Sequence, residues 1–275
     1  MEKRIIACLL LLLVLLALLP ACAMPDENGL RVTVLDIGQG DCVLLSVAGR
    51  HILVDTGSAI SRDLLLGELD LLGVDDLEAI VITHPHEDHY GNARMLLETC
   101  TVGALYIPQG EGDELGYRVL LEAAQTCGVE RRVLRDGDVL SVGDALFEVF
   151  CPLPDSPEPN NAGLVLRVCY GDCSLLFMGD AEWAAEAALL ARNKDWKCDF
   201  LKVGHHGSKT ACSQDFLQAT QPQIAAISCA VDNDYGFPHE PVLDGLEGIG
   251  AAVYRTDLQG TLRFFCDGAR VIFEE

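Results

Sequence analysis

Residues 83–89 read Thr-His-Pro-His-Glu-Asp-His and carry four side chains able to bind metal, directly after an apolar run. The apolar run predicts a buried strand, so the four side chains would lie on a loop at its carboxyl end, before a helix. The spacing H-x-H-x-D-H forms two pairs, His84 with His86 and Asp88 with His89. Imidazole and carboxylate groups suit divalent transition-metal ions. The sequence therefore predicts a metal site here, in preference to a polar turn that is rich in histidine by chance.

Two later apolar runs also end in side chains that bind metal. Asp180 follows the run 175–178, and the pair His205-His206 follows the run 200–203 between two glycines. Aspartate in this position often caps the next helix, but beside a histidine cluster we favour a ligand that bridges two metals. From the adjacent histidines we expect one ligand and one group that transfers protons or orients a ligand.

Carboxylates near the amino-terminal strands are weaker candidates. Asp55 ends a predicted strand, where it either forms a turn or orients a metal-bound histidine. Asp36 and Asp41 flank a glycine-rich turn, where backbone geometry alone favours aspartate. Of these two, Asp41 is the candidate for reaching the site.

Hydrophobic periodicity predicts an α/β fold with mixed sheets, because antiparallel strands come first, strands and helices alternate in the middle, and strands close the chain. Residues 151–161 contain four prolines and predict a surface loop. The expected strands cover 31–35, 42–47, 51–54, 79–82, 102–107, parts of 131–150, 164–170, 173–178, 200–203, 223–229, 251–256, 260–266 and 270–274. The expected helices cover 60–72, 91–99, 116–127, 181–193, 213–219 and 241–248.

The first 23 residues predict a signal peptide. Two basic residues precede an apolar run at 5–19, which is shorter than the roughly 20 residues that a spanning helix needs. Residues 19–22 resemble a lipobox, in which Cys22 would carry a lipid anchor. Residues 21–23 also fit cleavage by ordinary signal peptidase, which would release the protein. An uncleaved membrane anchor is the third alternative. Each alternative places residues 24–275, expected to form one domain, outside the cytoplasmic membrane, either released or lipid-anchored to its outer face.

Net charge and cysteine spacing argue against two classes of protein: nucleic-acid binders with a basic patch and proteins with a structural zinc site. The formal net charge of −23 argues against a protein that binds nucleic acid through a basic patch, although a hydrolase whose metals meet the phosphate locally fits it. The twelve cysteines include no C-x-x-C pair, which argues against a structural zinc knuckle. Most lie within apolar runs, so we expect buried free thiols.

Taken together, these motifs resemble those of the metallo-β-lactamase superfamily. The closer resemblance is to the hydrolase domain of ComEC-type competence proteins and their stand-alone exported relatives. It is carried by Leu-Asp-Ile-Gly-Gln-Gly-Asp at 35–41, Asn-Asn at 160–161, Leu-Lys-Val-Gly-His-His-Gly-Ser at 201–208 and Tyr-Arg-Thr-Asp at 254–257. The resemblance implies a four-layer αβ/βα sandwich with two mixed sheets and the metals at one edge.

The resemblance also implies two divalent metal ions, zinc or manganese, and a set of ligands for them. One ion would be held by His84 and His86, the other by Asp88, His89 and His205, with Asp180 as the bridge. From the chemistry of the residues we expect proton transfer by Asp88 and His206, and ligand orientation or substrate contact by Asp55, Asp41, Asn161 and Ser208.

Two positions depart from the superfamily pattern. Asn161 stands where another histidine is usual, a substitution that ComEC-type proteins share, so it would be a weak ligand or a phosphate contact. Phe237 replaces the histidine of a Tyr-Gly-His-Pro stretch, at 235–238. Any role of that histidine in substrate handling is therefore missing.

The expected function is an exported metal-dependent hydrolase, a phosphodiesterase or nuclease that cleaves DNA, single-stranded DNA included, through a metal-activated hydroxide. The alternatives are hydrolysis of cell-wall or lipid phosphoesters or of another ester or lactone, and a non-catalytic metal-binding surface domain. No protein partner is implied, and contact with the membrane would occur only through a lipid anchor at Cys22.

Overall fold

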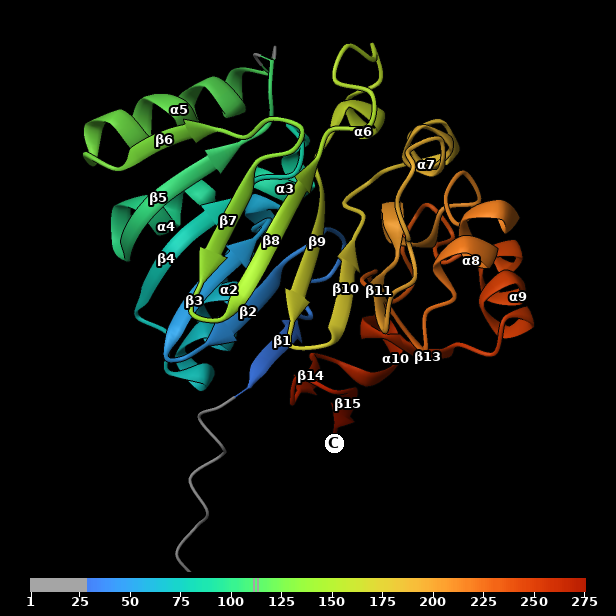
Figure 1. The fold of residues 1–275 in the computed structure, drawn as a ribbon. Helices are drawn as coiled ribbons and strands as arrows, with labels where there is room; N and C mark the ends of the chain where they lie inside the picture. Colours follow the sequence, from blue (N-terminus) through green and yellow to red (C-terminus); the bar gives the residue numbers. More distant parts are fainter. Residues whose placement is uncertain (1–28, 111, 113) are drawn as a thin grey trace, which may run out of the picture.

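The computed structural model describes residues 29–110, 112 and 114–275, so the predicted signal peptide and Cys22 lie outside the described residues. Two β-sheets pack face to face, and helices cover both outer faces (Figure 1). The predicted α/β class and the four-layer sandwich with two mixed sheets are confirmed. Within the described part of the chain, no helix is long and apolar enough to cross a membrane.

The first sheet has the strand order β15-β14-β1-β2-β3-β4-β5-β6. Pairing is antiparallel from β15 to β3 and parallel from β3 to β6. Its strands are β1 (Leu30–Val34), β2 (Val43–Val47), β3 (Arg50–Val54), β4 (Asp76–Val81), β5 (Thr101–Ile107), β6 (Glu130–Val133), β14 (Leu262–Cys266) and β15 (Val271–Glu274).

The second sheet has the order β13-β12-β11-β10-β9-β8-β7. Its pairing is parallel from β13 to β10 and antiparallel from β10 to β7. The strands are β7 (Val139–Val142), β8 (Ala145–Phe150), β9 (Val165–Tyr170), β10 (Cys173–Phe177), β11 (Phe200–Lys202), β12 (Ile224–Ile227) and β13 (Ala252–Arg255).

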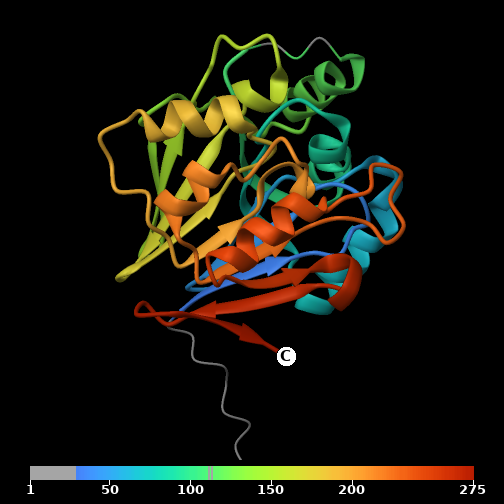
Figure 2. The same cartoon turned by 90° about the vertical axis from the view of Figure 1, so that its right-hand side faces the viewer.

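Helices follow the parallel strands, as crossover connections require. The first sheet is covered by α2 (Arg62–Leu72), α4 (Ala93–Thr99) and α5 (Leu115–Thr126), and the second by α7 (Trp183–Leu190), α8 (Gln214–Thr220) and α9 (Glu240–Gly248). Figure 2 looks onto the face that α7, α8 and α9 cover. Short helical turns complete the chain: η1 (Ala59–Ser61), α3 (Glu87–Tyr90), α6 (Pro159–Ala162), η2 (Gly204–Gly207) and α10 (Thr256–Gln259).

Three apolar layers hold the sandwich together. Inward-facing residues of both sheets, such as Val32, Phe147 and Phe264, form the central layer, and each outer helix layer packs on its own sheet. Burial of this much apolar surface is the main stabilising contribution to such a fold. Ten cysteines lie in the described part; all are free and seven are buried, as expected from their apolar surroundings.

Strand register brings the candidate residues to one edge. Val54 of β3 pairs with Val81 of β4, and Phe177 of β10 pairs with Lys202 of β11. The segments that follow these four strands therefore leave the two sheets side by side, at the carboxyl ends where open α/β sheets bind ligands.

Candidate metal centre

The metal-binding loop, residues 82–89 after β4, is folded tightly by its own backbone. His86 precedes α3, and its carbonyl accepts from the backbone N–H groups of His89 and Tyr90 at 3.0 and 3.2 Å. The turn brings the imidazoles of His84 and His89 within 4.1 Å, centroid to centroid. Nδ1 of His86 lies 3.0 Å from Nε2 of His84. Three imidazoles thus gather at the loop and the first turn of α3.

Asp180 lies at the centre of the histidine cluster and is buried. Its Oδ1 is 3.3 Å from Nε2 of His89 and 3.7 Å from Nε2 of His206. Its Oδ2 is 3.7 Å from Nε2 of His84 and 3.8 Å from Nε2 of His205. A carboxylate whose two oxygens face different histidines has the geometry of a bridging ligand.

His206, not His205, enters the groups of side chains whose ligand atoms lie within 4.8 Å of one another. These groups are His84-His89-Asp180, Asp88-His89-His206, Asp41-Asp55-His89 and Asp41-Asp180-His206. Nε2 of His206 is 3.3 Å from Oδ2 of Asp88, and its ring is buried, whereas that of His205 is partly exposed. Of the two adjacent histidines, His206 therefore lies closer to the other candidate ligands, while Nε2 of His205 faces Asp180 alone, at 3.8 Å.

Four buried polar atoms at the centre have no hydrogen-bond partner: Nε2 of His89, Nε2 of His206, Oδ1 of Asp180, and Oδ1 of Asp41, which has only its ion pairs with Lys202 and His206. An unpaired buried polar group costs about 1–3 kcal/mol, so such groups are rare in folded proteins. Here they converge, and imidazole and carboxylate are the donors that zinc and manganese accept. The residues present therefore fit divalent metal ions.

Hydrogen bonds fix which ring nitrogens are free. Asp55 accepts from the backbone N–H of Thr83 at 2.8 Å, from its hydroxyl at 2.7 Å and from Nδ1 of His89 at 2.8 Å. The Thr83 hydroxyl, already donating to Asp55, accepts from Nδ1 of His84 at 3.1 Å. Nδ1 of His206 donates to the Ser228 carbonyl at 3.0 Å. In each ring Nδ1 carries the proton, so Nε2 presents its lone pair to the centre.

Asp41 reaches the site through a fully buried lysine. Nζ of Lys202 lies 2.8 Å from both carboxylate oxygens of Asp41, and Oδ1 of Asp41 is 3.4 Å from Nδ1 of His206. Burial alone would raise the pKa of Asp41, but the charge of Lys202 and the contact with His206 hold it well below its usual range. Asp41 is therefore ionised and orients His206.

The electrostatics of the centre favour positive charge at the ring nitrogens. Burial alone would lower the pKa of His206, but Asp180 and Asp41 raise it to about 10. Burial opposes a charge on His89 in the same way, yet Asp180 and Asp55 raise its pKa well above the usual value. His84, in contrast, has its pKa lowered by burial and by the neighbouring His89. A proton or a metal ion at the Nε2 atoms of His89 and His206 is thus stabilised by the same carboxylates.

His205 and Ser208 belong to a hydrogen-bond network beside the centre. Nδ1 of His205 is 3.1 Å from Oε1 of Glu182, which also accepts from the Thr210 hydroxyl at 2.7 Å. The Ser208 hydroxyl is 2.9 Å from that of Thr210. The network orients the partly exposed His205 ring, while Ser208 bonds within its own loop instead of reaching the centre.

Asn161 does not join the metal-binding groups. Its Oδ1 accepts from the backbone N–H groups of Glu182 and Ala185 at 3.2 Å, and its Nδ2 donates to the Glu182 carboxylate. The side chain thus caps the start of α7. The neighbouring Asn160 has a buried, unpaired Oδ1 in the same short helix α6, whose end contacts His84 at Gly163.

Left-handed backbone conformations cluster at this edge. Asp55, His205 and His206 have φ angles of 58°, 48° and 54°. Residues other than glycine rarely adopt this backbone region. Gly40, at φ 131°, packs so closely on the Asp88 carbonyl that a Cβ atom would collide with it. The turn at 38–41 therefore needs glycine for its fit to the metal-binding loop.

The family model of the metallo-beta-lactamase superfamily matches residues 35–231. The chain belongs to this superfamily. Its relatives include ComE operon protein 3 of Bacillus subtilis, 36% identical over 253 residues that cover 85% of this chain and 33% of that protein. Competence protein ComA of Neisseria gonorrhoeae is 33% identical over 240 residues, 86% of this chain and 32% of that protein.

These relatives are ComEC-type competence proteins, so the predicted resemblance is confirmed. The chain spans about a third of their length. Among solved structures, the metallo-beta-lactamase fold protein YhfI of Bacillus subtilis has a TM-score of 0.57 at 14% identity, covering 83% of this chain and 96% of that one. A diphosphatase of the PhnP family has a TM-score of 0.51 at 16% identity, covering 86% and 98%. The structural likenesses show the shared fold.

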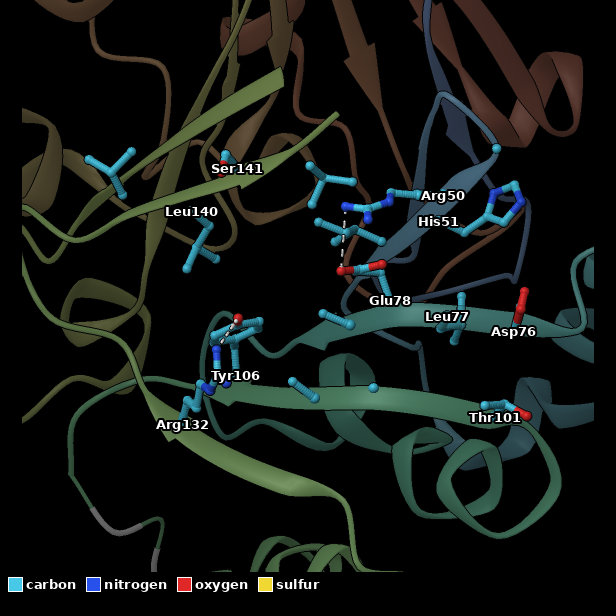
Figure 3. A pocket seen from close by; sticks show the side chains of 17 residues that line it. Arg50, His51, Asp76, Leu77, Glu78, Thr101, Tyr106, Arg132, Leu140 and Ser141 are labelled. Carbon is cyan, nitrogen blue, oxygen red and sulfur yellow. Dashed lines mark hydrogen bonds and ion pairs between the residues drawn. The ribbon is translucent and has the colours of Figure 1, made fainter. Parts of the chain in front are cut away.

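A cavity of about 620 Å³ lies away from the metal centre (Figure 3). Its lining includes Arg50, Asp76 and Thr101, the first residues of β3, β4 and β5. Figure 3 shows Arg50 directed at Glu78, 3.8 Å away. None of the candidate metal-binding residues lines this cavity, so it contributes nothing to the centre.

Sequence reasoning missed Lys202, Thr83 and Glu182. One signal was present: Lys202 is a single charge within the apolar run 200–203, and a buried lysine needs an ionised partner. Thr83 is adjacent to His84 and Glu182 lies two residues after Asp180, but nothing in their neighbours indicates which atoms they bond.

Proposed function

We propose that the protein is a metal-dependent phosphodiesterase that cleaves DNA outside the cytoplasmic membrane. The observation that carries this proposal is the convergence of unpaired, buried Nε2 atoms of His89 and His206 on the unpaired oxygen of Asp180. Membership of the superfamily supports metal-dependent hydrolysis. The names of its relatives, competence proteins and a recombination protein of Haemophilus influenzae, support DNA as the substrate.

Two ions, zinc or manganese, fit the centre. We assign one to His84 and His86 and the other to Asp88, His89 and His206, with Asp180 between them. Ions bound there would supply Lewis acidity, which lowers the pKa of a water and neutralises charge on phosphate oxygens.

Side chains of the protein would provide the proton transfers. Burial alone would raise the pKa of Asp88, but the contact with His206 and the charge of His89 lower it to about 2, so Asp88 is ionised at neutral pH and would orient the attacking water by accepting a hydrogen bond. His205, aimed by Glu182 and open to solvent, is placed to contact the phosphate or donate a proton to the leaving oxygen.

A cavity of about 370 Å³ beside His86 offers space for the substrate. Pro85 and three prolines of the predicted surface loop, Pro154, Pro157 and Pro159, line it, and no lysine or arginine is among its described lining residues. With a net charge of −23, the protein would repel a polyanion at long range. Affinity for DNA would therefore depend on the metals and on contacts with uncharged parts of the nucleotide.

The test uses purified protein loaded with Mn²⁺ or Zn²⁺, single-stranded DNA and bis(4-nitrophenyl) phosphate. His206→Gln should lose part of the bound metal, measured by elemental analysis, and with it the turnover of both substrates. His205→Gln should keep its metal and lose about 10²- to 10⁴-fold in kcat, the usual contribution of a general acid. His51→Gln, at a histidine bonded to Ser46 on the first sheet, is the matched control and should behave as wild type.

Several results would contradict the proposal. Turnover of neither substrate with either metal would refute phosphodiester hydrolysis, and hydrolysis of lipid or cell-wall phosphoesters or of a lactone alone would move the activity to those classes. Metal loss in His205→Gln but not in His206→Gln would restore the roles predicted from the sequence. Export and lipidation are separate proposals, tested by fractionating cells that express the wild type and Cys22→Ala.

A further inference from the structure

A series of stacked rings, called here the aromatic ladder, leads from the surface to the metal centre: Tyr235, Phe237 and His206. Tyr235 is 64% exposed and stacks on Phe237, with ring centroids 5.3 Å apart and an interplanar angle of 12°. Phe237 in turn stacks on His206 at 6.0 Å and meets the edge of His205 at 5.6 Å. The outer face of the Tyr235 ring is therefore only two ring contacts from a side chain assigned to the metals.

Hydrogen bonds hold the ladder in place. The Asn233 amide donates to the carbonyls of Ala230 and Phe237 at 3.0 and 2.7 Å and accepts from the Phe237 N–H at 2.9 Å. The backbone N–H of His239 donates to the Gly207 carbonyl at 2.9 Å, which ties the loop to the segment of η2. A rigid aromatic surface binds a planar ligand with less loss of conformational entropy than a mobile one.

Packing of the core does not explain Tyr235. Its ring is largely outside the protein, unlike Phe237, and it belongs to none of the three apolar layers. Large exposed aromatic rings beside a site are typical of ligand contacts. The charges of the same loop restrict the ligand: Asp232 and Asp234, three residues and one residue before Tyr235, are exposed and repel phosphate. An uncharged planar group, rather than a phosphate, suits the face of Tyr235.

We propose that the outer face of Tyr235 is a stacking site for a base of a single-stranded nucleic acid. The phosphodiester to be cleaved, in the same strand, would lie at the metal centre. This inference rests on the proposed function, because only a nucleic-acid substrate brings a base and a scissile phosphate together. Stacking on an aromatic ring tolerates every base, so the site confers a preference for unpaired bases over duplex without selecting sequence. Phe237, which replaces the histidine of the related motif, supports the Tyr235 ring from behind.

A dependence on salt follows from the charges. Proteins that bind DNA through phosphate contacts lose affinity steeply as salt rises. Here the stacking contact is uncharged and the nearby acids repel the backbone, so added salt screens repulsion. Affinity should stay level or rise between low and moderate salt.

The experiment measures binding separately from cleavage. A fluorescent oligothymidylate and an abasic oligomer with the same number of phosphates are titrated into metal-loaded His205→Gln protein, which should keep its metal and cleave slowly, with anisotropy as the readout. A 2-aminopurine oligomer reports stacking directly through its fluorescence. Wild-type and variant kcat/KM on both cleavable oligomers are measured in parallel.

We expect the base-containing oligomer to bind more tightly than the abasic one. Tyr235→Leu should weaken binding of the base-containing oligomer about five- to hundredfold, the range typical of base stacking on aromatic rings. It should also abolish the 2-aminopurine signal, whereas Tyr235→Phe should keep both the affinity and the signal. Leu71→Ala, at an exposed apolar residue of α2, is the control and should change neither.

Each remaining outcome decides between the two proposals. Equal binding of base and abasic oligomers, or no binding of either, overturns the stacking site, and continued metal-dependent cleavage would then leave the proposed function intact. Base-dependent binding that needs Tyr235, without cleavage of any phosphodiester, supports the stacking site and refutes the proposed function. Competition by choline with the same dependence on Tyr235, and no discrimination between the oligomers, would assign the ring to an organic cation instead.

Discussion

Replacing Lys202 by methionine should destabilise the protein strongly, because it leaves Asp41 as a buried charge without a partner. Lys202 is 1% exposed and Asp41 3%, and Nζ is 2.8 Å from both carboxylate oxygens. Removing one partner of a buried ion pair costs about 3–5 kcal/mol. At about 2–4 °C per kcal/mol for a domain of this size, the melting temperature should fall by about 6–20 °C.

Two further variants separate the lost ion pair from lost packing. Asp41→Leu combined with Lys202→Met removes both charges and should recover most of the stability. Lys209→Met, at an exposed lysine seven residues on, should leave the free energy of unfolding unchanged. Urea denaturation of the metal-free proteins at pH 7 provides these free energies.

The dependence on pH gives a second check of the same pair. Because Lys202 holds the pKa of Asp41 well below its usual range, the stability that the pair contributes is present above the ordinary aspartate pKa of about 3.9 and is lost as pH falls below the folded-state pKa. In Lys202→Met, protonation of Asp41 relieves the buried charge, so the difference from wild type should shrink in acid. A loss below 1 kcal/mol at pH 7, or an equal loss in the single and double variants, would refute the reasoning.

Three other predictions concern the site and the thiols. Gly40→Ala should reduce bound metal, because its Cβ would collide with the carbonyl of the metal-binding loop, whereas Gly38→Ala, also at a positive φ (77°) but with open space around its Cβ, should retain it in elemental analysis. Asp55→Asn should weaken metal binding about 10- to 100-fold in competition with a chromogenic chelator, since it orients a ligand; unchanged affinity would contradict that role. At pH 8 an alkylating reagent should modify Cys100 and Cys127 first, because burial raises the pKa of the other described thiols, and peptide mapping should find the rest modified only after unfolding.

Sequence alone predicted the parts of the site that depend on local spacing. The H-x-H-x-D-H loop and Asp180 are recognisable because each comes directly after a buried strand, and the loops at the carboxyl ends of parallel strands meet at one edge of a sheet. Fold class and most element positions are likewise predictable, because they depend on the periodicity of neighbouring residues. The short turns α6, α10 and η2 carry too few residues for a periodic pattern, so they were not predicted.

Contacts between distant segments could not be predicted from the sequence. Asp41 and Lys202 are 161 residues apart, and only the packing of the two sheets joins them. The choice between His205 and His206 depends on a left-handed backbone that turns one ring inward, and adjacent identical residues give no sign of it. Asn161 was predicted to reach the metal or the phosphate because of its place in the motif, whereas its partners lie at the start of α7.

At the left-handed residues Asp55, His205 and His206, thermal stability and metal binding favour different side chains. Each such backbone conformation costs about 1–3 kcal/mol in a residue other than glycine. Glycine would relieve that cost at either histidine, and a population selected only for surviving heat without metal should drift toward glycine at 205 and 206. Each gain would delete an imidazole from the site. Persistence of both histidines in a lineage is therefore a sign that the chemistry, and not the fold, is under selection.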